Sequence, residues 1–599
     1  MKLHNRLLAL VLVVATPPPG LAADAPDEAA SWVDESNRNA TVLLEVLARY
    51  SPESAGSLGV EGADTEVADL KPGYVERTEA DVEAAVAELT RRLAAEDDPR
   101  VRQDLEILVE AGRDNVTGSR LFRHHLLPYV NVPRIVFFGM QALLDPQLPK
   151  EKHDAALVRL RRYVGMEEGY EPILSLGRAR MEEQFSAQGL LGPYRGQVEQ
   201  DLANAPRFAA GIGDLFRTLE VEGYEEALAE YEKQLGDWQA WVKSDLMPRA
   251  RAEFPLPPEL YKWNLRQFGV EADPEELIDD ATRAFIEIRN EMKAIAPLVA
   301  QERGWDETDY RTVLVRLRGE QLDGEEILPW YDDVLERLEG VIRDEGVVTL
   351  PERDAIIRLG TEAENSAQPA PHLRPPRLIG NTGQRPEFVL PLANPAAEAA
   401  GEGRMDDFTH RAAAWTLTVH EARPGHELQY SSMIENGVSV ARAVFAFNSV
   451  NVEGWALYAE AEMKPYLPMD GQLVSLQHRL LRSARAFLDP MANLGRIGYD
   501  EVRQFLEGEV GLSPSMSRQE ADRYTFRAPG QATSYFYGYQ KLLALRAATE
   551  LALGERFDRK AFHDFVLAQG LLPPALMRAA VMDEFLGAES GIAARPAGH

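Results

Sequence analysis

The chain has 599 residues, a formal net charge of −32 and 45% hydrophobic residues. So negative a protein is a poor partner for nucleic acids and for anionic membrane surfaces. The sequence contains no cysteine, which excludes disulfides, thiolate metal ligands and the cysteine that a lipoprotein anchor requires.

Residues 1–23 have the features of a signal peptide. Lys2 and Arg6 precede a short apolar run, and small residues close the segment at Ala22 and Ala23. The run is too short for a spanning helix of about 20 residues, and no later segment is long and apolar enough to span. We therefore expect an exported protein, periplasmic or extracellular, that is not a lipoprotein and has no membrane span.

Helical patterns dominate the chain after this segment. Thr78 and Asp81 are spaced to cap a helix over residues 81–95. Asp273 and Pro274 mark the start of another helix, as an N-cap acid followed by proline. Apolar residues at helical spacing predict further helices over residues 231–247, 327–342 and 472–488. The predicted fold class is therefore mainly α.

Residues 350–404 interrupt this pattern with many prolines, so we expect little helix there. Residues 387–392 predict a short edge strand, and we expect a small β element near residues 375–392. An exposed strand at that point could pair with a peptide backbone. An ordinary irregular connector is the alternative.

A chain of this length exceeds one ordinary hydrophobic core. We expect a two-lobed helical fold around a deep central cleft. The proline-rich residues 254–258 are the best linker candidate. This places an N-terminal lobe at residues 24–255 and a second lobe, containing the motif described next, at residues 256–599. The two lobes can interleave.

Residues 420–429, His-Glu-Ala-Arg-Pro-Gly-His-Glu-Leu-Gln, place two imidazoles around a carboxylate. Zinc hydrolases commonly carry two histidines four residues apart on a helix, with a glutamate beside the first. Here His426 follows His420 by six residues, which leaves the side chains about 120° apart on a straight helix. Pro424 and Gly425 favour a local break or bulge that would bring both imidazoles to one side. The alternative is a helix that ends before the proline, with two unrelated surface histidines.

Glu453 and Glu460 lie seven residues apart and so share one face of a predicted helix. Their surroundings are apolar, where carboxylates are seldom buried unless they are paired or bound to a metal. Glu453 is therefore a candidate third ligand, and Glu460 could fix the ring of a ligand histidine. Two histidines and a glutamate with an open fourth position are typical of catalytic zinc sites. The alternative is an ordinary amphipathic helix with salt-bridged glutamates.

Three blocks of sequence together resemble one known family. The first is residues 420–429, and the second, residues 453–460, reads Glu-Gly-Trp-Ala-Leu-Tyr-Ala-Glu. The third, residues 523–539, contains Arg-Ala-Pro-Gly-Gln-Ala and ends in Tyr-Phe-Tyr-Gly-Tyr. They resemble the bacterial domain-of-unknown-function family 885 (DUF885), whose members are regarded as similar to zinc metallopeptidases of the gluzincin type. A looser resemblance covers most of the chain.

The resemblance implies a zincin-like fold, a Zn²⁺ cofactor and a set of site residues. These are the metal ligands His420, His426 and Glu453, the general base Glu421, the catalytic tyrosines Tyr535 and Tyr539, and the substrate-binding Arg523, Arg527 and Asn493. Either tyrosine could stabilise an oxyanion, and the arginines could bind a substrate carboxylate. Relatives often have a histidine where this chain has Asn493, a departure expected to alter specificity or rate.

These features predict a secreted zinc-dependent peptidase that hydrolyses short peptides, because a deep cleft excludes folded proteins. Zinc would activate a water, and Glu421 would take its proton. The alternative is a catalytically inactive or altered peptide-binding member of the same family. Retention of Glu421 weighs against this alternative. The sequence leaves open the physiological substrate, the oligomeric state and the choice between carboxypeptidase, dipeptidase and oligopeptidase.

Overall fold

The computed structural model describes residues 28–403 and 405–587, so the predicted signal peptide lies outside the described residues. Helices make up most of this chain and the strands form one small sheet, which confirms the mainly α class. Among the residues that the structure describes, no helix combines the length and apolar character needed to cross a membrane.

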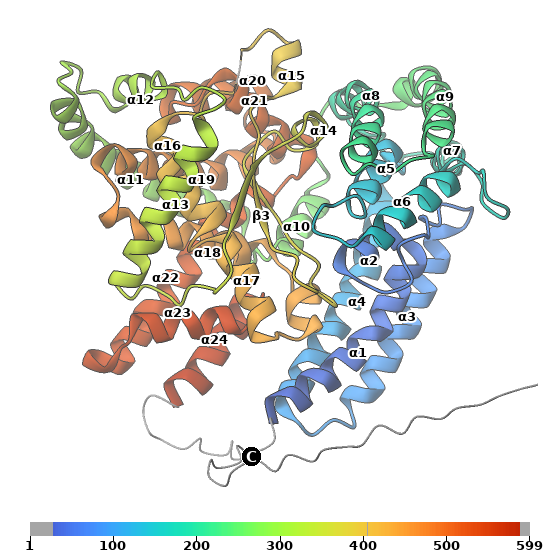
Figure 1. Cartoon of the computed structure of the whole chain (residues 1–599), viewed down its shortest axis with the longest axis horizontal. Coiled ribbons are helices and arrows are strands. Elements are labelled where there is room, and N and C mark those ends of the chain that lie inside the picture. The colour runs from blue at the N-terminus through green and yellow to red at the C-terminus, as the bar shows by residue number, and fades with distance from the viewer. Residues whose placement is uncertain (1–27, 404, 588–599) are drawn as a thin grey trace, which may run out of the picture.

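The N-terminal part is built from helices, drawn from blue to green on the right of Figure 1. Labels with η mark π-helical or 3-10 turns. In chain order the helices are α1 (Glu28–Tyr50), α2 (Pro52–Leu58), α3 (Tyr74–Leu93), α4 (Pro99–His125), α5 (Val132–Gln141), α6 (Lys150–Tyr163), α7 (Ile173–Glu182), α8 (Arg195–Thr218), α9 (Glu225–Trp241), η1 (Val242–Leu246) and η2 (Met247–Arg249).

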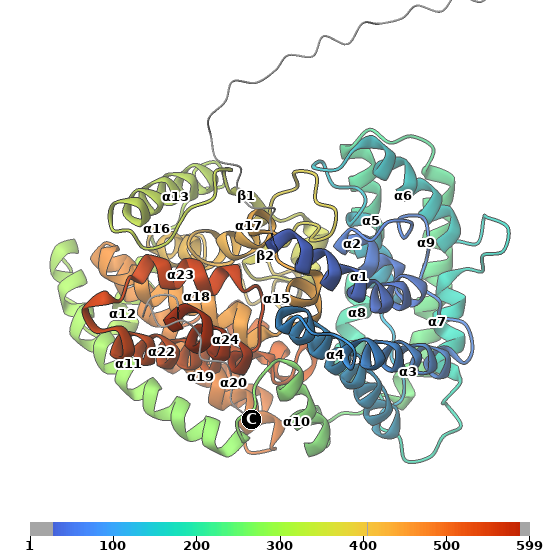
Figure 2. The ribbon, with the colours of Figure 1, turned by 90° about the horizontal axis from the view of Figure 1, so that it is seen from below.

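The middle of the chain contains long helices and then the sheet. Figure 2 shows α11 along the outer side of the molecule, where it packs on α19. The elements are α10 (Pro258–Gln267), α11 (Pro274–Arg303), α12 (Tyr310–Arg318), α13 (Ile327–Asp344), β1 (Ile356–Leu359), α14 (Glu362–Ala367), β2 (His372–Arg374), β3 (Glu387–Leu390) and α15 (Pro395–Ala399).

The C-terminal part contains the sequence motifs and is again helical. Its elements are α16 (Arg411–Leu417), η3 (Thr418–Ala422), α17 (His426–Asn436), η4 (Ala441–Phe445), α18 (Ser449–Met463), η5 (Lys464–Tyr466), α19 (Met469–Asn493), α20 (Tyr499–Phe505), η6 (Leu506–Val510), α21 (Pro514–Asp522), η7 (Arg523–Arg527), η8 (Gln531–Thr533), α22 (Ser534–Leu553), η9 (Gly554–Arg556), α23 (Arg559–Ala568), α24 (Pro574–Ala580) and η10 (Val581–Phe585).

The sheet corrects one prediction. Its strand order is β1-β3-β2, with β3 parallel to β1 and antiparallel to β2. The predicted strand at residues 387–392 is present as β3, but its expected edge position was wrong, because strands pair with it on both sides. The two strands beside it, β1 and β2, lie at the edges of this sheet.

Helix boundaries follow capping chemistry. At α11 the predicted start is confirmed, since the Asp273 side chain accepts a hydrogen bond from the Glu275 amide at 3.0 Å. At α3 the predicted cap was wrong: the helix begins at Tyr74, and the Thr78 hydroxyl donates to the Tyr74 carbonyl inside it. The proline-rich stretch contains two short helices, one of them with Pro395 in its first turn, where proline is tolerated.

The three largest buried apolar clusters of the described residues hold these elements together. One joins α5 to α9 and includes Ala363 and Ala367 of α14. A second joins α1, α3 and α4 and includes Ala441 of η4. The largest contains the helices after residue 254. Residues from beyond the proposed boundary thus pack within the N-terminal part, and the boundary near residue 255 stays a prediction.

Candidate metal centre

The motif at residues 420–429 forms a helix, a break and a second helix. His420 and Glu421 lie in the π-helical turn η3, which widens the end of α16. The chain leaves the helix at Arg423, whose backbone is extended (φ −121°, ψ 132°), and α17 begins at His426. The structure therefore combines the two possibilities that the Pro-Gly pair offered, since a bulged turn precedes a break. The two histidines come from different helical segments.

Gly425 allows the chain to fold back onto the first segment. A Cβ atom at this position would lie 2.0 Å from the His420 carbonyl oxygen and 2.4 Å from that of Val419. No side chain fits at such distances, so glycine is required for this close approach. The Trp455 indole donates a hydrogen bond to the Pro424 carbonyl at 2.9 Å and fixes the turn against α18.

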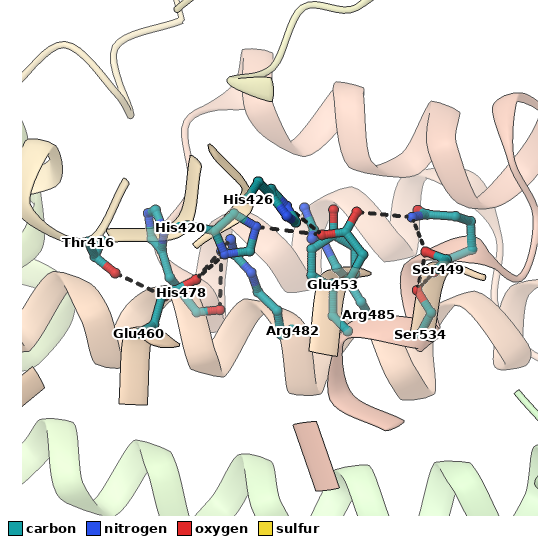
Figure 3. A network of polar contacts seen from close by, with 12 residues as sticks. Thr416, His420, His426, Ser449, Glu453, Glu460, His478, Arg482, Arg485 and Ser534 are labelled. Carbon is teal, nitrogen blue, oxygen red and sulfur yellow. Dashed lines mark hydrogen bonds and ion pairs between the residues drawn. The ribbon is translucent and has the colours of Figure 1, made fainter. Parts of the chain in front are cut away.

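Three side chains converge at this turn (Figure 3). The Oε2 atom of Glu453, on α18, lies 3.3 Å from Nε2 of His426 and 3.6 Å from Nε2 of His420. The two imidazole rings are 4.8 Å apart and nearly perpendicular, at 80°. Zinc–nitrogen and zinc–oxygen bonds of about 2.0–2.1 Å at tetrahedral angles separate neighbouring ligand atoms by about 3.3–3.4 Å. The donor set and its spacing fit a zinc ion.

Unpartnered atoms support this fit. Oε2 of Glu453 and Oε2 of Glu421 are buried and form no hydrogen bond. A buried polar atom without a partner costs about 1–3 kcal/mol, so such a group points to a missing ligand or ion. A metal would satisfy the Glu453 oxygen. Glu421, beside the first ligand, keeps an unpaired oxygen.

Glu460 orients His420 through the ring nitrogen that faces away from Glu453. It accepts a hydrogen bond from Nδ1 of His420 at 2.6 Å and another from the Thr416 hydroxyl at 2.9 Å. Burial opposes its charge, but Arg482 and His420 outweigh burial and lower the pKa of Glu460 to about 2. Glu460 therefore stays ionised and directs Nε2 of His420 toward Glu453.

A second polar chain supports Glu453 from the other side (right in Figure 3). The Gln531 amide donates to Oε1 of Glu453 at 3.4 Å and to the Ser449 hydroxyl at 2.8 Å. Ser449 in turn bonds to Ser534 at 2.7 Å. These contacts engage Oε1, so the free oxygen of Glu453 is the one that faces both histidines.

The three candidate ligands line a cavity of about 780 Å³. Glu421, Tyr535, Arg523 and Arg527 also line it, together with residues from α5, α8 and β2. The Tyr535 ring stacks on His420 at 6.0 Å, and its hydroxyl accepts a hydrogen bond from Arg523 at 2.9 Å. Burial raises the pKa of Tyr535, so its phenol stays protonated.

One protein-family model matches most of the chain. A family model described as a bacterial protein of unknown function (DUF885) matches residues 52–581. The chain belongs to the DUF885 family. The predicted family is thus confirmed, whereas the likeness to zinc metallopeptidases remains untested. No curated protein matches the chain.

Two solved structures share the fold of this DUF885 protein. One is a candidate lipoprotein from Colwellia psychrerythraea, 18% identical, with a TM-score of 0.76, covering 92% of this chain and 99% of that one. The other is a candidate lipoprotein of unknown function from Shewanella oneidensis, 18% identical, with a TM-score of 0.69 and coverages of 92% and 100%. At this identity the likeness concerns the fold alone.

Two residues implied by the family resemblance lie away from the cavity of this DUF885 protein. Tyr539 does not line it, and its hydroxyl accepts a hydrogen bond from Arg479 at 3.4 Å. Asn493 does not line it either. Its amide donates to Oδ1 of Asp489 and to the Tyr524 carbonyl, both at 3.0 Å. Asn493 thus links the end of α19 to η7.

Other cavity residues were missed by sequence reasoning. His372, on the edge strand β2, lines the cavity, and its Nδ1 donates to the Ala370 carbonyl at 2.9 Å. Burial lowers the pKa of His372. Arg134, at the start of α5, lines the same cavity. Neither sits in a recognisable motif, since only the fold brings them to the site. Gln531 lies within the third block and could have been singled out there.

Proposed function

We propose that this DUF885 protein is an exported, zinc-dependent peptidase acting on short peptides. The observation that carries the proposal is the convergence of His420, His426 and Glu453 at the wall of a cavity that also holds Glu421. Zinc bound by these ligands would polarise a substrate carbonyl and lower the pKa of a coordinated water to about 7.

Glu421 is the proposed general base. Its carboxylate lines the cavity, follows a ligand histidine in the chain and has an oxygen without a hydrogen-bond partner. That oxygen can accept the proton of the attacking water and then deliver it to the leaving amine nitrogen. A positioned general base typically contributes on the order of 10²–10⁴ in rate.

Tyr535 is the better placed of the two tyrosines. Its hydroxyl oxygen accepts a hydrogen bond from Arg523, so its own proton is available for another acceptor. A raised pKa keeps that proton in place. We propose that Tyr535 donates it as a hydrogen bond to the oxyanion that develops on the carbonyl. Loss of one such donor typically costs about 10²–10³ in kcat.

The edge strand β2 is the proposed support for the peptide backbone. Pairing with a peptide backbone, suggested above for residues 387–392, is proposed for β2 instead, because β3 is paired on both sides. His372 and Leu373 of β2 line the cavity. An extended peptide could add to the open edge of β2 through main-chain hydrogen bonds.

The alternative, a peptide-binding protein without catalysis, rested on the replacement at Asn493. That side chain lies outside the cavity, so the replacement has no direct route to substrate. The unpartnered oxygen of Glu421 favours the catalytic proposal.

The test combines metal analysis with digestion of a peptide library by the wild type and Glu421→Gln. We expect stoichiometric zinc in both proteins and a rate lower by about 10²–10⁴ in the variant. Glu555→Gln, the same change at an exposed position, should cleave like wild type. A zinc-loaded wild type that cleaves nothing spared by Glu421→Gln would refute the peptidase proposal.

The ligand assignment has its own test. His426→Ala and Glu453→Ala should each lose tightly bound zinc, because three protein ligands hold the ion in catalytic sites. Retention of zinc in Glu453→Ala would remove Glu453 from the ligand set while leaving the histidines in it.

A further inference from the structure

Two arginines that line the cavity donate no hydrogen bond to a carboxylate in the described part of the chain. Arg134 comes from α5 in the N-terminal part, and Arg527 ends η7 in the C-terminal part. Both line the cavity that contains the candidate metal centre. The two parts of the molecule therefore each contribute one guanidinium to the same space.

The contacts of Arg134 are weak. Its Nη1 donates to the Ala367 carbonyl at 3.4 Å, and its guanidinium lies 5.0 Å above the Phe138 ring. No carboxylate oxygen among residues 28–403 and 405–587 lies within 4.0 Å of it. The side chain is exposed although it lines a cavity, so most of its N–H donors are open to a ligand.

Arg527 is also incompletely paired. Its Nε and Nη2 both donate to Oε1 of Gln200, at 3.1 and 2.9 Å, and its nearest carboxylate oxygen, on Asp522, is 3.9 Å away. By contrast, Arg485 forms two parallel bonds of 2.7 and 2.6 Å to Glu520. Arg523 is engaged as well, with Gln531 and Tyr535.

The positive charges of Arg134 and Arg527 repel one another. Although solvent reaches the Arg134 side chain, desolvation by the surrounding cavity walls lowers its pKa, and the charge of Arg527 lowers that pKa further. The acidic group that interacts with both is Asp201. Its carboxylate is already engaged by the Tyr129 hydroxyl at 2.6 Å, and burial raises its pKa. Two like charges in a cavity are stabilised by an anion between them, and guanidinium matches a carboxylate in shape.

The family resemblance implies Arg523 and Arg527 for a substrate carboxylate, but Arg523 is engaged by Gln531 and Tyr535. We infer that Arg134 takes the place of Arg523 and forms, with Arg527, a subsite for a carboxylate of the substrate. The inference rests on the proposed function in that it places this subsite in the peptidase cavity. A carboxylate held there would be the C-terminus of the peptide or an acidic side chain. Because the subsite has a fixed position relative to the metal ligands, a bound C-terminus would restrict cleavage to a bond at a set distance from it.

The test uses one peptide in three forms: free C-terminal acid, C-terminal amide, and amide with one internal glutamate. We expect wild type to show a lower KM for a carboxylate-bearing form than for the plain amide, by about 10- to 100-fold, the range of charge-assisted hydrogen bonds. Arg134→Gln should abolish the difference by raising that KM and leave the KM of the amide unchanged. Arg337→Gln, at an exposed arginine outside the cavity, should retain it.

Which carboxylate is bound follows from the same series. Preference for the free acid assigns the subsite to the C-terminus, and preference for the internal glutamate assigns it to a side chain. Equal KM values for all three forms in wild type would overturn the inference. So would an undiminished preference in both Arg134→Gln and Arg527→Gln, of which the second serves if the first does not fold.

Binding separates this inference from catalysis. Calorimetric titration of Glu421→Gln with the same three peptides measures affinity without cleavage. Tighter binding of the acid, lost when Arg134→Gln is added, supports the subsite even if wild type hydrolyses nothing, in which case only the proposed function fails. Equal affinity for acid and amide overturns the subsite even if wild type is an active peptidase.

Discussion

Two buried clusters of charge in this protein differ in one respect. At Asp104, on α4, the carboxylate accepts hydrogen bonds from Ser36 at 2.5 Å, Ser439 at 2.6 Å and Arg442 at 2.8 Å. Both of its oxygens are engaged, and it ties the N-terminal helices to η4. At Glu453 one oxygen faces two imidazoles and has no hydrogen-bond partner. The Asp104 carboxylate, which serves stability alone, has hydrogen bonds to both oxygens. The cluster of His420, His426 and Glu453, called the open cluster below, has an unpartnered oxygen and lines the cavity.

The strongest test of this contrast is Asp104→Ala. Removing one member of a buried ion pair leaves Arg442 uncompensated and should cost about 3–5 kcal/mol in the free energy of unfolding. Zinc content should be unchanged, because the cluster contains no candidate ligand. Urea unfolding followed by circular dichroism measures the loss, and Asp97→Ala, at an exposed position, is the control. A loss below about 1 kcal/mol, the scale of an exposed pair, would contradict the assigned role.

Gly425→Ala tests the open cluster without changing a ligand. A Cβ there meets the His420 carbonyl, so the turn must move, at a cost of about 1–3 kcal/mol. We expect weaker zinc binding although all three ligands remain, measured by competition with a chelator. Gly236→Ala in α9 meets nothing within 4 Å and should instead stabilise by about 0.5–1 kcal/mol. Unaltered zinc affinity in Gly425→Ala would show that the turn does not position His426.

Much of the fold could be predicted from the sequence because its signals are local. Asp273 and Pro274 define the start of α11 through contacts within one turn. The edge position predicted for residues 387–392 was wrong because strand order depends on β1 and β2, whose pairing has no local signal. The start of α3 was misplaced since Gly73, rather than the predicted Thr78, precedes the helix.

The candidate site divides in the same way. His420, Glu421 and His426 lie in one short motif, and Glu453 and Glu460 lie in a second. Their spacing, the apolar surroundings of the glutamates and the family resemblance together indicated them. Arg134 and His372 come from segments far away in the sequence, and only tertiary packing brings them to the cavity. Tyr539 illustrates the opposite limit, because it follows Tyr535 by one helical turn yet does not reach the cavity.

Glu460→Gln sharpens the comparison within the metal centre. The change removes the negative charge that orients His420 and should weaken zinc binding about 10- to 100-fold, as is typical for such outer partners. Glu462→Gln on the same helix is the matched control, since its partner is Arg546. Zinc affinity is measured by chelator competition. Equal affinities for the two variants would mean that Glu460 serves folding alone.

The smallest expected effect is a pH dependence of stability that distinguishes His420, in the candidate metal centre, from His563, whose two ring nitrogens both have hydrogen-bond partners. Burial opposes charge on His420, but the neighbouring carboxylates of Glu453 and Glu460 outweigh burial and raise the pKa of His420 to about 9. A raised folded-state pKa contributes stability that is complete below about 6.5 and lost as the pH rises through 9. His563 is hydrogen-bonded to the Val347 carbonyl and to the Tyr458 hydroxyl. Burial lowers its pKa to about 4, so its contribution is present above about 6.5 and lost as the pH falls.

Zinc binding should remove the first dependence and leave the second, because a ligand imidazole must be deprotonated. We therefore expect the Tm of the metal-free protein to fall more steeply between pH 6.5 and 9 than that of the zinc-loaded protein. Below pH 6.5 the contribution of His563 should be the same in both forms, since its contacts do not involve the metal ligands. Scanning calorimetry at fixed scan rate measures both ranges. Parallel curves above pH 6.5 would mean that His420 is not protonated in the metal-free fold, and that the open cluster holds no proton for a metal to displace.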